Sequence, residues 1–326
     1  MALLAYATGG LFIQIGLVCG RGEPCAQEGA VTRSLDTVSV LIPCYNQAAH
    51  IGHTIEATLN QTRSPHEVIV VDDASTDASA QIVGQYPVKL LRHRCNSGPA
   101  VARNTALQAA SGEIVLYVDA DAYAEAHLVE TLLSAYEQHP SPQLAGVGGR
   151  GIETQIHTPS DRWRVTHAKQ DFGDKRRYNV PYLFGLCASY YREVLLEVGG
   201  FDAFFPINAG EDADLGYRLI RAGYYLLYLP EAVVYHQHSD TTERLRRVQY
   251  NWFYWSYLAK QRSGLNPLSL VAGTIRRLFT ETLSDALIRH DLDLVKEDIA
   301  IFQTKMSALL AAMRSSPPSI KEAKSK

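Results

Sequence analysis

The sequence predicts an α/β fold in which a mostly parallel sheet is flanked by helices and followed by a C-terminal helical region. Three observations support this prediction. From Asp36 onward, short β-branched runs alternate with helical segments, the pattern of a parallel sheet whose faces are covered by helices. The strand segments are almost continuously apolar, as burial on both faces requires. From Thr242 the pattern is helical only.

Length and composition exclude several classes of protein. The 326 residues, 46% hydrophobic and 20% charged, suffice for one large domain with an appendage or for two domains, and they exclude disordered, collagen-like and coiled-coil chains. A net charge of -3 and a pI near 6.4 argue against a nucleic-acid partner. The five cysteines are scattered and lack zinc spacing, so we expect a reducing compartment and no structural zinc.

Two boundaries divide the chain. Residues 1–36 are predicted to be an N-terminal extension. It is either disordered or the result of an upstream start codon. Its apolar run from Leu3 to Val18 makes a signal or anchor the alternative, but it is short for a membrane span and no Lys or Arg precedes it. Residues 37–240 are predicted to form the α/β domain, and residues 241–326 the helical region.

The first half of the α/β domain contains four predicted strands, at residues 38–42, 67–71, 88–92 and 113–118. Predicted helices at residues 51–60, 75–86 and 100–110 connect them. Ser75 or Asp77 is expected to cap the second helix, and the third closes near Gly112.

The second half is less regular. Residues 143–156 are strand-like and rich in glycine, which indicates a bulged strand. Residues 161–179 carry six basic side chains and are expected to form a polar loop. A helix follows Gly210 and stops at Gly223, and strands are expected near residues 225–229 and 233–236. The C-terminal helices are interrupted at residues 264–267.

Carboxylates follow two of the predicted strands. Asp72 and Asp73 follow one, and Asp119 and Asp121 follow another. Ligands of open α/β sheets bind at the carboxyl ends of strands, so one crevice is expected to collect both pairs. Residues two apart on an extended chain point the same way, which would crowd Asp119 against Asp121. A Mg²⁺ or Mn²⁺ ion would relieve this repulsion, although acids after strands also cap helices.

Two further clusters have candidate chemistry. Glu211, Asp212 and Asp214 stand at a predicted helix start, where ordinary capping explains acidic residues but three exceed what capping needs. One of them is a candidate general base. His236 and His238 follow a strand, where either imidazole is a candidate metal ligand; the alternative is an ordinary surface or core histidine.

Six motifs follow one another over about residues 37 to 240. They are Val40-Leu41-Ile42-Pro43-Cys44-Tyr45-Asn46, Val70-Val71-Asp72-Asp73-Ala74-Ser75-Thr76-Asp77, Gly98-Pro99-Ala100-Val101-Ala102-Arg103-Asn104, Asp119-Ala120-Asp121, Gly199-Gly200-Phe201-Asp202 and Gly210-Glu211-Asp212. In this order the motifs resemble those of the family 2 inverting glycosyltransferases with a GT-A fold. The resemblance implies a nucleotide-sugar donor, a divalent metal and direct displacement with inversion at the anomeric carbon.

The resemblance also implies roles for nucleotide-binding residues. Pro43, Tyr45 and Asp73 would line the base pocket, with the Asp73 carboxylate accepting from a uracil-type N–H. Asp72 belongs with this group, and Arg103 would lie near the base or the diphosphate.

The remaining implied roles concern the metal and the chemistry. Asp119 would face the ribose and the metal, and Asp121 would bind the metal, which is expected to be Mg²⁺ or Mn²⁺. His236 resembles the metal-ligating histidine of the family, with His238 as the alternative. Asp212 would take the proton of the acceptor hydroxyl.

Two departures from the family pattern limit this transfer of roles. The motif usually reads Asp-x-Asp-Asp, but Ala122 stands at the last place, so one outer-sphere acid is absent. The Gln-x-x-Arg-Trp motif of processive synthases is also absent, because residues 249–253 lack the Arg-Trp step. This absence favours transfer of one or a few sugars over polymerisation.

The expected partners are a UDP-sugar and a glycan or lipid-linked acceptor, in surface glycan or polysaccharide synthesis. The expected location is the cytoplasm, and the alternative within it is a peripheral position at the inner face of the membrane. The alternatives are an inactive sugar-nucleotide binding module and a nucleotidyltransferase. Asp121 and Asp212 are both present, which argues against the first alternative, and no glycine-rich basic loop follows Ile42, which argues against the second.

Overall fold

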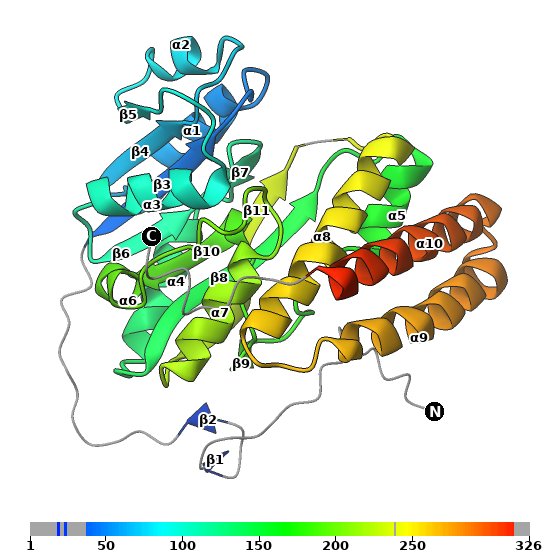
Figure 1. The fold of residues 1–326 in the computed structure, drawn as a ribbon. Helices are drawn as coiled ribbons and strands as arrows, with labels where there is room; N and C mark the ends of the chain where they lie inside the picture. Colours follow the sequence, from blue (N-terminus) through cyan, green and yellow to red (C-terminus); the bar gives the residue numbers. More distant parts are fainter. Residues whose placement is uncertain (1–17, 20–22, 25–36, 238, 316–326) are drawn as a thin grey trace. The chain divides into compact units, whose positions relative to one another are not determined.

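The computed structural model describes residues 18–19, 23–24, 37–237 and 239–315 (Figure 1). Within these, residues 37–154 and 170–237 form one compact unit, which we call the sheet unit. Residues 155–169 and 239–315 form a second, the helical unit. The sequence-based boundary near residue 240 kept 155–169 with the sheet, whereas the structure groups this segment with the C-terminal helices. Most of the predicted extension, residues 1–36, lies outside the described residues.

A nine-stranded sheet forms the core of the sheet unit, with the order β5-β4-β3-β6-β10-β8-β11-β7 and with β9 paired to β11. The pairings show that β3, β4, β5, β6, β8 and β11 run in one direction and the other three strands in the opposite one. The strands are β3 (Val38–Cys44), β4 (Glu67–Asp72), β5 (Lys89–Arg92), β6 (Ile114–Tyr117), β7 (Ala122–Ala124), β8 (Leu144–Glu153), β9 (Arg177–Tyr178), β10 (Ala188–Tyr191) and β11 (Tyr225–His236). A separate short pair, β1 (Val18–Cys19) and β2 (Glu23–Pro24), precedes them.

The strand directions decide where the polar residues gather. The carboxyl ends of β3, β4, β6, β8 and β11 all lie at the same edge of the sheet. The order of the chain also reverses beside β3, because β4 and β5 follow on one side of it and β6 on the other. Such a reversal opens a crevice at the carboxyl ends of the strands. The residues that follow these strands therefore face a common region.

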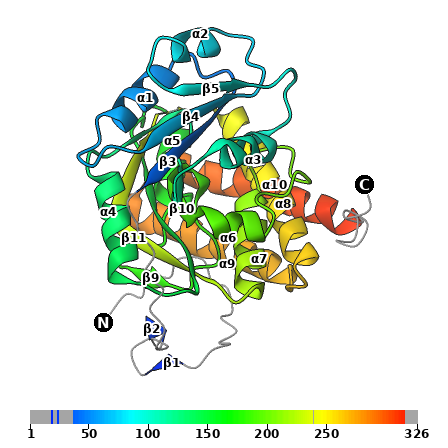
Figure 2. The same cartoon turned by 90° about the vertical axis from the view of Figure 1, so that its left-hand side faces the viewer.

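Helices cover both faces of the sheet. α3 and α4 lie on opposite sides of it (Figure 2), with α3 against β3 and β4 and α4 against β8 and β11. The strands β3, β4 and β6 are buried nearly throughout. The predicted mostly parallel sheet with flanking helices is thereby confirmed. The helical segments of this unit are α1 (Ile51–Leu59), α2 (Ser79–Val83), α3 (Pro99–Ala109), α4 (Leu128–Gln138), η1 (Gly185–Cys187), α6 (Arg192–Glu197) and α7 (Glu211–Arg221).

The predicted helix at residues 75–86 is wrong in length, because only α2 forms there. Its expected caps have other partners. The Ser75 hydroxyl accepts a hydrogen bond from the Asn46 backbone N–H (2.9 Å), and the Asp77 carboxylate accepts one from the Ala48 N–H (3.0 Å). The Ser75 side chain thus binds the neighbouring loop instead of starting a helix, as Ser often does in turns. The Asp77 carboxylate binds both the loop and the start of α2, because it also accepts a hydrogen bond from the Ser79 N–H at 2.9 Å.

The predicted polar loop at residues 161–179 is wrong in its first part, which is α5 (Pro159–His167). Thr158 and Asp161 form a capping box at the start of this helix, and Pro159 occupies its first turn. Arg164, one of the six basic residues of this segment, is buried and paired with Asp240.

The glycine-rich strand is confirmed as β8, and the two strands expected after Gly223 form the single strand β11. The register between β8 and β11 shifts between Tyr228 and Val233. A Cβ atom at Gly149 would lie 2.0 Å from the Ala232 carbonyl oxygen at this irregularity. Glycine is therefore needed for the close approach of the two backbones.

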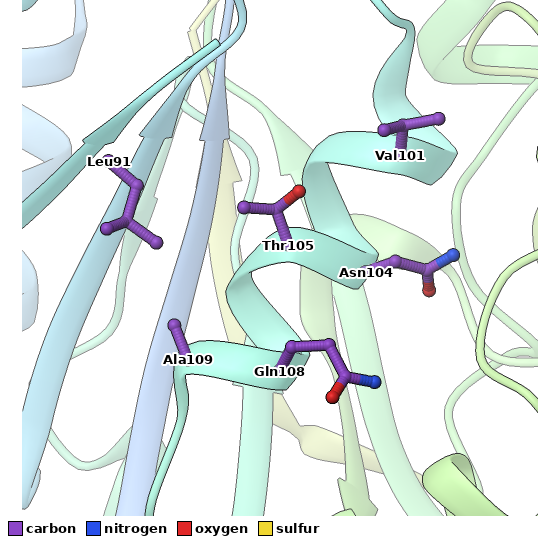
Figure 3. Close-up of a pocket in the computed structure, with 6 residues that line it drawn as sticks. All are labelled: Leu91, Val101, Asn104, Thr105, Gln108 and Ala109. Carbon is purple, nitrogen blue, oxygen red and sulfur yellow. The ribbon is translucent and has the colours of Figure 1, made fainter.

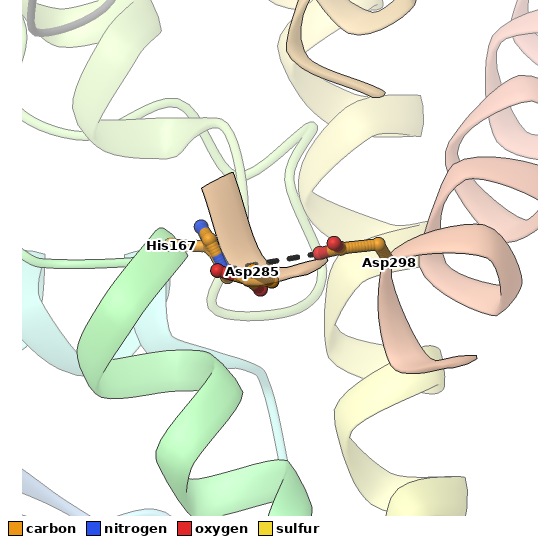
Figure 4. A group of neighbouring side chains, drawn as sticks. All are labelled: His167, Asp285 and Asp298. Carbon is orange, nitrogen blue, oxygen red and sulfur yellow. Dashed lines mark hydrogen bonds and ion pairs between the residues drawn. The ribbon is translucent and has the colours of Figure 1, made fainter. Parts of the chain in front are cut away.

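The helical unit consists of α5 with α8 (Thr242–Arg262), α9 (Leu268–Ser284), η2 (Asp285–Arg289) and α10 (Leu292–Arg314). α10 packs against each of the others (Figure 1). In its interior the His167 Nε2 atom lies 2.7 Å from Asp285 and 3.7 Å from Asp298 (Figure 4). Because Arg289 also binds Asp285, these residues form an ion-pair network that joins α5, η2 and α10. None of the helices in the described part of the chain is long and apolar enough to cross a bilayer.

Candidate active site

Two loops at the carboxyl edge of the sheet are joined by hydrogen bonds. The Asn46 side chain, after β3, accepts a hydrogen bond from the Thr76 N–H at 2.8 Å. The bonds from the backbone of Asn46 and Ala48 to the side chains of Ser75 and Asp77 join the same two loops. Asn46 has a φ of 53°, a left-handed conformation that asparagine tolerates. The joined loops leave Pro43 half-buried and Tyr45 45% exposed, which provides an apolar and aromatic surface at the carboxyl edge of the sheet.

Asp73 and Asp72 are both buried, with different partners. The Asp73 carboxylate accepts hydrogen bonds from the backbone N–H groups of Ser97 (2.9 Å) and Gly98 (2.8 Å). His93 lies 2.6 Å from the same carboxylate. The Asp72 carboxylate binds Arg92 at 3.2 Å. In the described residues Asp73 therefore anchors the loop that leads into α3, and its carboxylate is only 4% exposed.

Arg103 connects three parts of the chain. It projects from α3, is 1% exposed, and donates to the Glu211 carboxylate at 2.7 Å. Its Nη2 atom donates to the Asp119 Oδ1 atom at 3.2 Å and to the Asn208 side chain at 3.0 Å. Arg103 thus joins the start of α7 to the turn after β6. Its two terminal nitrogens donate to two carboxylates and one amide oxygen of the protein, and its predicted place near the base or the diphosphate stays a prediction.

Asp212 stands beside this cation at the start of α7. Its Oδ2 atom accepts a hydrogen bond from the Gly185 N–H at 2.9 Å, and its Oδ1 atom is buried without a hydrogen-bond partner among the described residues. Burial raises the pKa of the Asp212 carboxyl, and Arg103 opposes part of this rise. A carboxylate with a raised pKa and an unused oxygen is a competent proton acceptor.

Gly185 is part of this arrangement. A Cβ atom at this position would lie 2.8 Å from the Arg103 Nη2 atom and 3.0 Å from the Asp212 Oδ2 atom. Both are well inside ordinary contact distance, so any other residue would displace one of the two charged groups. Glycine therefore permits the backbone N–H to reach the Asp212 carboxylate.

Asp119 and Asp121 do not stand on an extended chain as the sequence predicted. The Ala122 N–H donates to the Asp119 carbonyl oxygen at 3.0 Å, which closes a turn after β6. The turn gives the two carboxylates different neighbours. Asp119 faces Arg103, whereas Asp121 contacts the Gln47 amide at 3.4 Å and the His236 imidazole at 3.4 Å.

His236 is held between two carboxylates. Its Nε2 atom lies 3.4 Å from the Asp121 Oδ1 atom, and its Nδ1 atom lies 3.2 Å from the Glu153 Oε1 atom. Burial acts to lower the pKa of His236, but the hydrogen bonds to Asp121 and Glu153 raise it to about 10. An imidazole nitrogen and a carboxylate oxygen this close together fit one divalent cation such as Mn²⁺. His238 lies outside the described residues.

The structure therefore brings predicted residues into two neighbouring groups within the sheet unit. Asp119, Arg103 and Asp212 form one, and Asp121 with His236 forms the other. Several further residues contact these groups but were not predicted from the sequence, because their positions follow from strand register and loop packing, which leave no signal in the sequence. These residues are Gln47, His93, Glu153, Gly185 and Asn208.

A hollow of about 530 Å³ lies elsewhere, beside α3 and β5 (Figure 3). It is mostly apolar, and none of the predicted site residues lines it. Thr105, one of its lining residues, contacts His93 at 2.9 Å, which connects it to Asp73 through one further hydrogen bond. Its lining residues are Leu91, Val101, Asn104, Thr105, Gln108 and Ala109.

Comparison with known proteins identifies the family. Residues 39–199 match the family described as Glycosyl transferase family 2. A pre-mycofactocin glycosyltransferase of Mycobacterium tuberculosis is 32% identical over 210 residues, which cover 62% of this chain and 43% of the relative. The protein therefore spans less than half the length of this relative. The matched segment, residues 39–199, belongs to glycosyl transferase family 2.

Solved structures agree on the fold. The mannosyltransferase PcManGT from Pyrobaculum calidifontis, in complex with GDP-Man and Mn²⁺, superimposes with a TM-score of 0.54 and 22% identity, over 90% of this chain and 83% of that one. Residues 1–349 of TarS from S. aureus, in complex with UDP-GlcNAc, superimpose with a TM-score of 0.54 and 18% identity, over 86% of this chain and 82% of that one. The sheet unit has the GT-A glycosyltransferase fold.

Proposed function

We propose that the protein transfers a sugar from a nucleotide-diphosphate donor to a hydroxyl acceptor, in a metal-dependent reaction that inverts the anomeric carbon. The observation that supports this most directly is the Asp212 carboxyl, enclosed at the carboxyl edge of the sheet with one oxygen unused and its pKa raised. A single displacement needs one such proton acceptor. Family membership supplies the reaction class.

The proposed division of roles follows from the contacts. Asp212 removes the proton from the acceptor hydroxyl, while the Gly185 N–H and Arg103 hold its position and charge. Such a positioned base typically contributes about 10²–10⁴-fold in rate. Asp121 and His236 would hold the divalent cation, with Asp119 nearby. The bound cation would offset charge that develops on the leaving diphosphate.

For the donor, we propose a nucleotide sugar bound along the joined loops, with Pro43 and Tyr45 against the base. A UDP-sugar is our expectation; TarS is in complex with UDP-GlcNAc and PcManGT with GDP-Man, so a GDP-sugar is the alternative. The prediction that Asp73 accepts from the base competes with its observed bonds to Ser97 and Gly98. We propose that Asp73 acts mainly by shaping the pocket.

For the acceptor, we propose a glycan or lipid-linked glycan of a cell-surface polymer. The relatives named as acting on poly(ribitol-phosphate) and as a chondroitin synthase support this class. Peripheral membrane association and a cytoplasmic location belong to the same proposal.

The experiment that tests the donor is a screen of UDP- and GDP-sugars with MnCl₂ or MgCl₂. We expect slow, metal-dependent release of the nucleoside diphosphate from one donor, even without an acceptor. An inactive binding module would bind a donor but release no nucleoside diphosphate from it. A nucleotidyltransferase would instead release pyrophosphate from a nucleoside triphosphate and a sugar phosphate, and that result would contradict the proposal.

The Asp212→Asn variant tests the general base. We expect transfer to fall by about 10²–10⁴-fold, because the amide cannot take the proton, while donor affinity stays near that of the native protein. Rates from the donor identified in the screen and affinities from titration calorimetry measure the two effects. Asp174→Asn, at a side chain 92% exposed, is the matched control and should change neither. A large loss of donor affinity in Asp212→Asn would contradict the assignment.

A further inference from the structure

Glu153 is brought beside His236 by the pairing of two strands. In the parallel ladder between β8 and β11, Glu153 is the register partner of His236, and each residue is the last of its strand. On the other side of β11, His236 pairs with Ala122, directly after Asp121. A row of three side chains therefore crosses the carboxyl edge of the sheet, from Asp121 through His236 to Glu153.

The hydrogen bonds along this row fix the imidazole ring. The two ring nitrogens face opposite carboxylates, Nδ1 toward Glu153 at 3.2 Å and Nε2 toward Asp121 at 3.4 Å. All three side chains are enclosed, with exposed fractions of 9%, 9% and 14% for Glu153, His236 and Asp121. The Thr154 N–H and hydroxyl both donate to the His236 carbonyl oxygen, at 3.0 and 2.9 Å.

We propose that Glu153 is a positioning residue for the metal site: it orients His236 so that Nε2 points at the cation held with Asp121. This inference rests on the metal dependence in the proposed function. A histidine that binds a metal commonly donates its other ring N–H to a carboxylate, which fixes the ring and increases its basicity. Glu153 occupies that place in the sheet, and the motifs of the family do not include it.

A purely structural role for Glu153 makes a different prediction. In that case its removal would lower the stability of the sheet unit and leave the metal affinity of the folded protein unchanged. In a positioning role, affinity depends on what stands at position 153. Glutamine keeps an oxygen that accepts from Nδ1–H but loses the charge, and alanine loses both. Affinity should then decrease in the order glutamate, glutamine, alanine.

The test measures binding of Mn²⁺ alone to the full chain by electron paramagnetic resonance, which counts free Mn²⁺. We expect Glu153→Ala to weaken Mn²⁺ binding by about 10–100-fold and Glu153→Gln by less. Asp121→Asn serves as the variant that loses a direct ligand, and Asp174→Asn as the exposed acidic control. Circular dichroism and thermal melting identify any variant that fails to fold. If Glu153→Ala does not fold, Glu153→Gln, equal in size to the native residue, still tests the inference.

The outcomes separate this inference from the proposed function. Graded weakening in folded variants supports the positioning role. Equal Mn²⁺ affinity in the native protein and in folded Glu153→Gln and Glu153→Ala overturns the inference alone, provided Asp121→Asn binds weakly. If Asp121→Asn binds Mn²⁺ as tightly as the native protein, the proposed metal site is wrong and the inference falls with it.

Discussion

At the scale of single residues, Arg103 is the group on which the arrangement of the acids depends. Glu211, Asp119 and Asp212 all lie within its electrostatic reach, and Glu211 is itself 1% exposed. Burial raises the pKa of both Glu211 and Asp212, and Arg103 opposes this rise. Buried carboxylates close together are stable only with such a cation between them.

Arg103→Met tests this dependence. The variant leaves buried acids without their cation, so we expect the free energy of unfolding to fall by about 3–5 kcal/mol. Urea unfolding followed by far-ultraviolet circular dichroism measures the change. Arg221→Met, at an exposed arginine of α7, is the control and should change stability by less than about 0.5 kcal/mol. A comparably small change for Arg103→Met would mean that the acids do not need this partner.

At the scale of secondary-structure elements, the two wrong predictions have different causes. In the helix predicted at residues 75–86, Ser75 and Asp77 accept hydrogen bonds from Asn46 and Ala48, partners distant in sequence about which local propensity contains no information.

The start of α5, in contrast, has a local signal, because Thr158 and Asp161 form a capping box. The loop prediction for this segment overlooked that pattern. Ser239 and Asp240, distant in sequence, add donors to the same Asp161 carboxylate.

The start of α5 leads to a prediction about pH. Burial acts to raise the pKa of Asp161, but donors from Asp240, Ser239, Thr158 and His157 lower it to about 2. Because the folded pKa lies below the unfolded value of 3.8, this carboxylate stabilises the fold fully above about pH 5, and the contribution is lost as the pH falls toward 2. The shift corresponds to about 2 kcal/mol.

Asp161→Asn isolates this contribution. The native protein should be more stable than the variant by about 2 kcal/mol or more at pH 6, and the difference should shrink as the pH falls toward 2. Tryptophan fluorescence during urea unfolding reports on the helical unit, because the three tryptophans of the chain, Trp163, Trp252 and Trp255, all lie there. A stability difference that does not vary with pH would show that Asp161 is not the titrating group.

At the scale of the whole molecule, the alternation of strand and helix sufficed to predict the fold class, because two-sided burial leaves a plain apolar pattern. The candidate site was predicted residue by residue only where motifs resembled a family. The register of the strands could not be predicted from the sequence, because nothing in the sequence indicates that Glu153 pairs with His236 across β8 and β11. Likewise the turn at Asp119, closed by one backbone bond to Ala122, reversed an expectation based on ideal strand geometry.

The proposed metal site leads to a prediction for the thermal stability of the whole chain. A nucleoside diphosphate that binds only the folded protein with Mn²⁺ stabilises it by mass action, by about 2.7 kcal/mol at 100 times its Kd. For a unit the size of the sheet unit this corresponds to a rise of roughly 5–10 °C in Tm. Differential scanning calorimetry with UDP or GDP should show the rise with MnCl₂ and lose it with EDTA. Asp121→Asn should show no Mn²⁺-dependent rise, since it lacks a ligand of the cation that joins the diphosphate to the sheet edge. An equal rise with EDTA present would mean that the diphosphate is held by protein groups alone, which would remove the cation from the proposed mechanism.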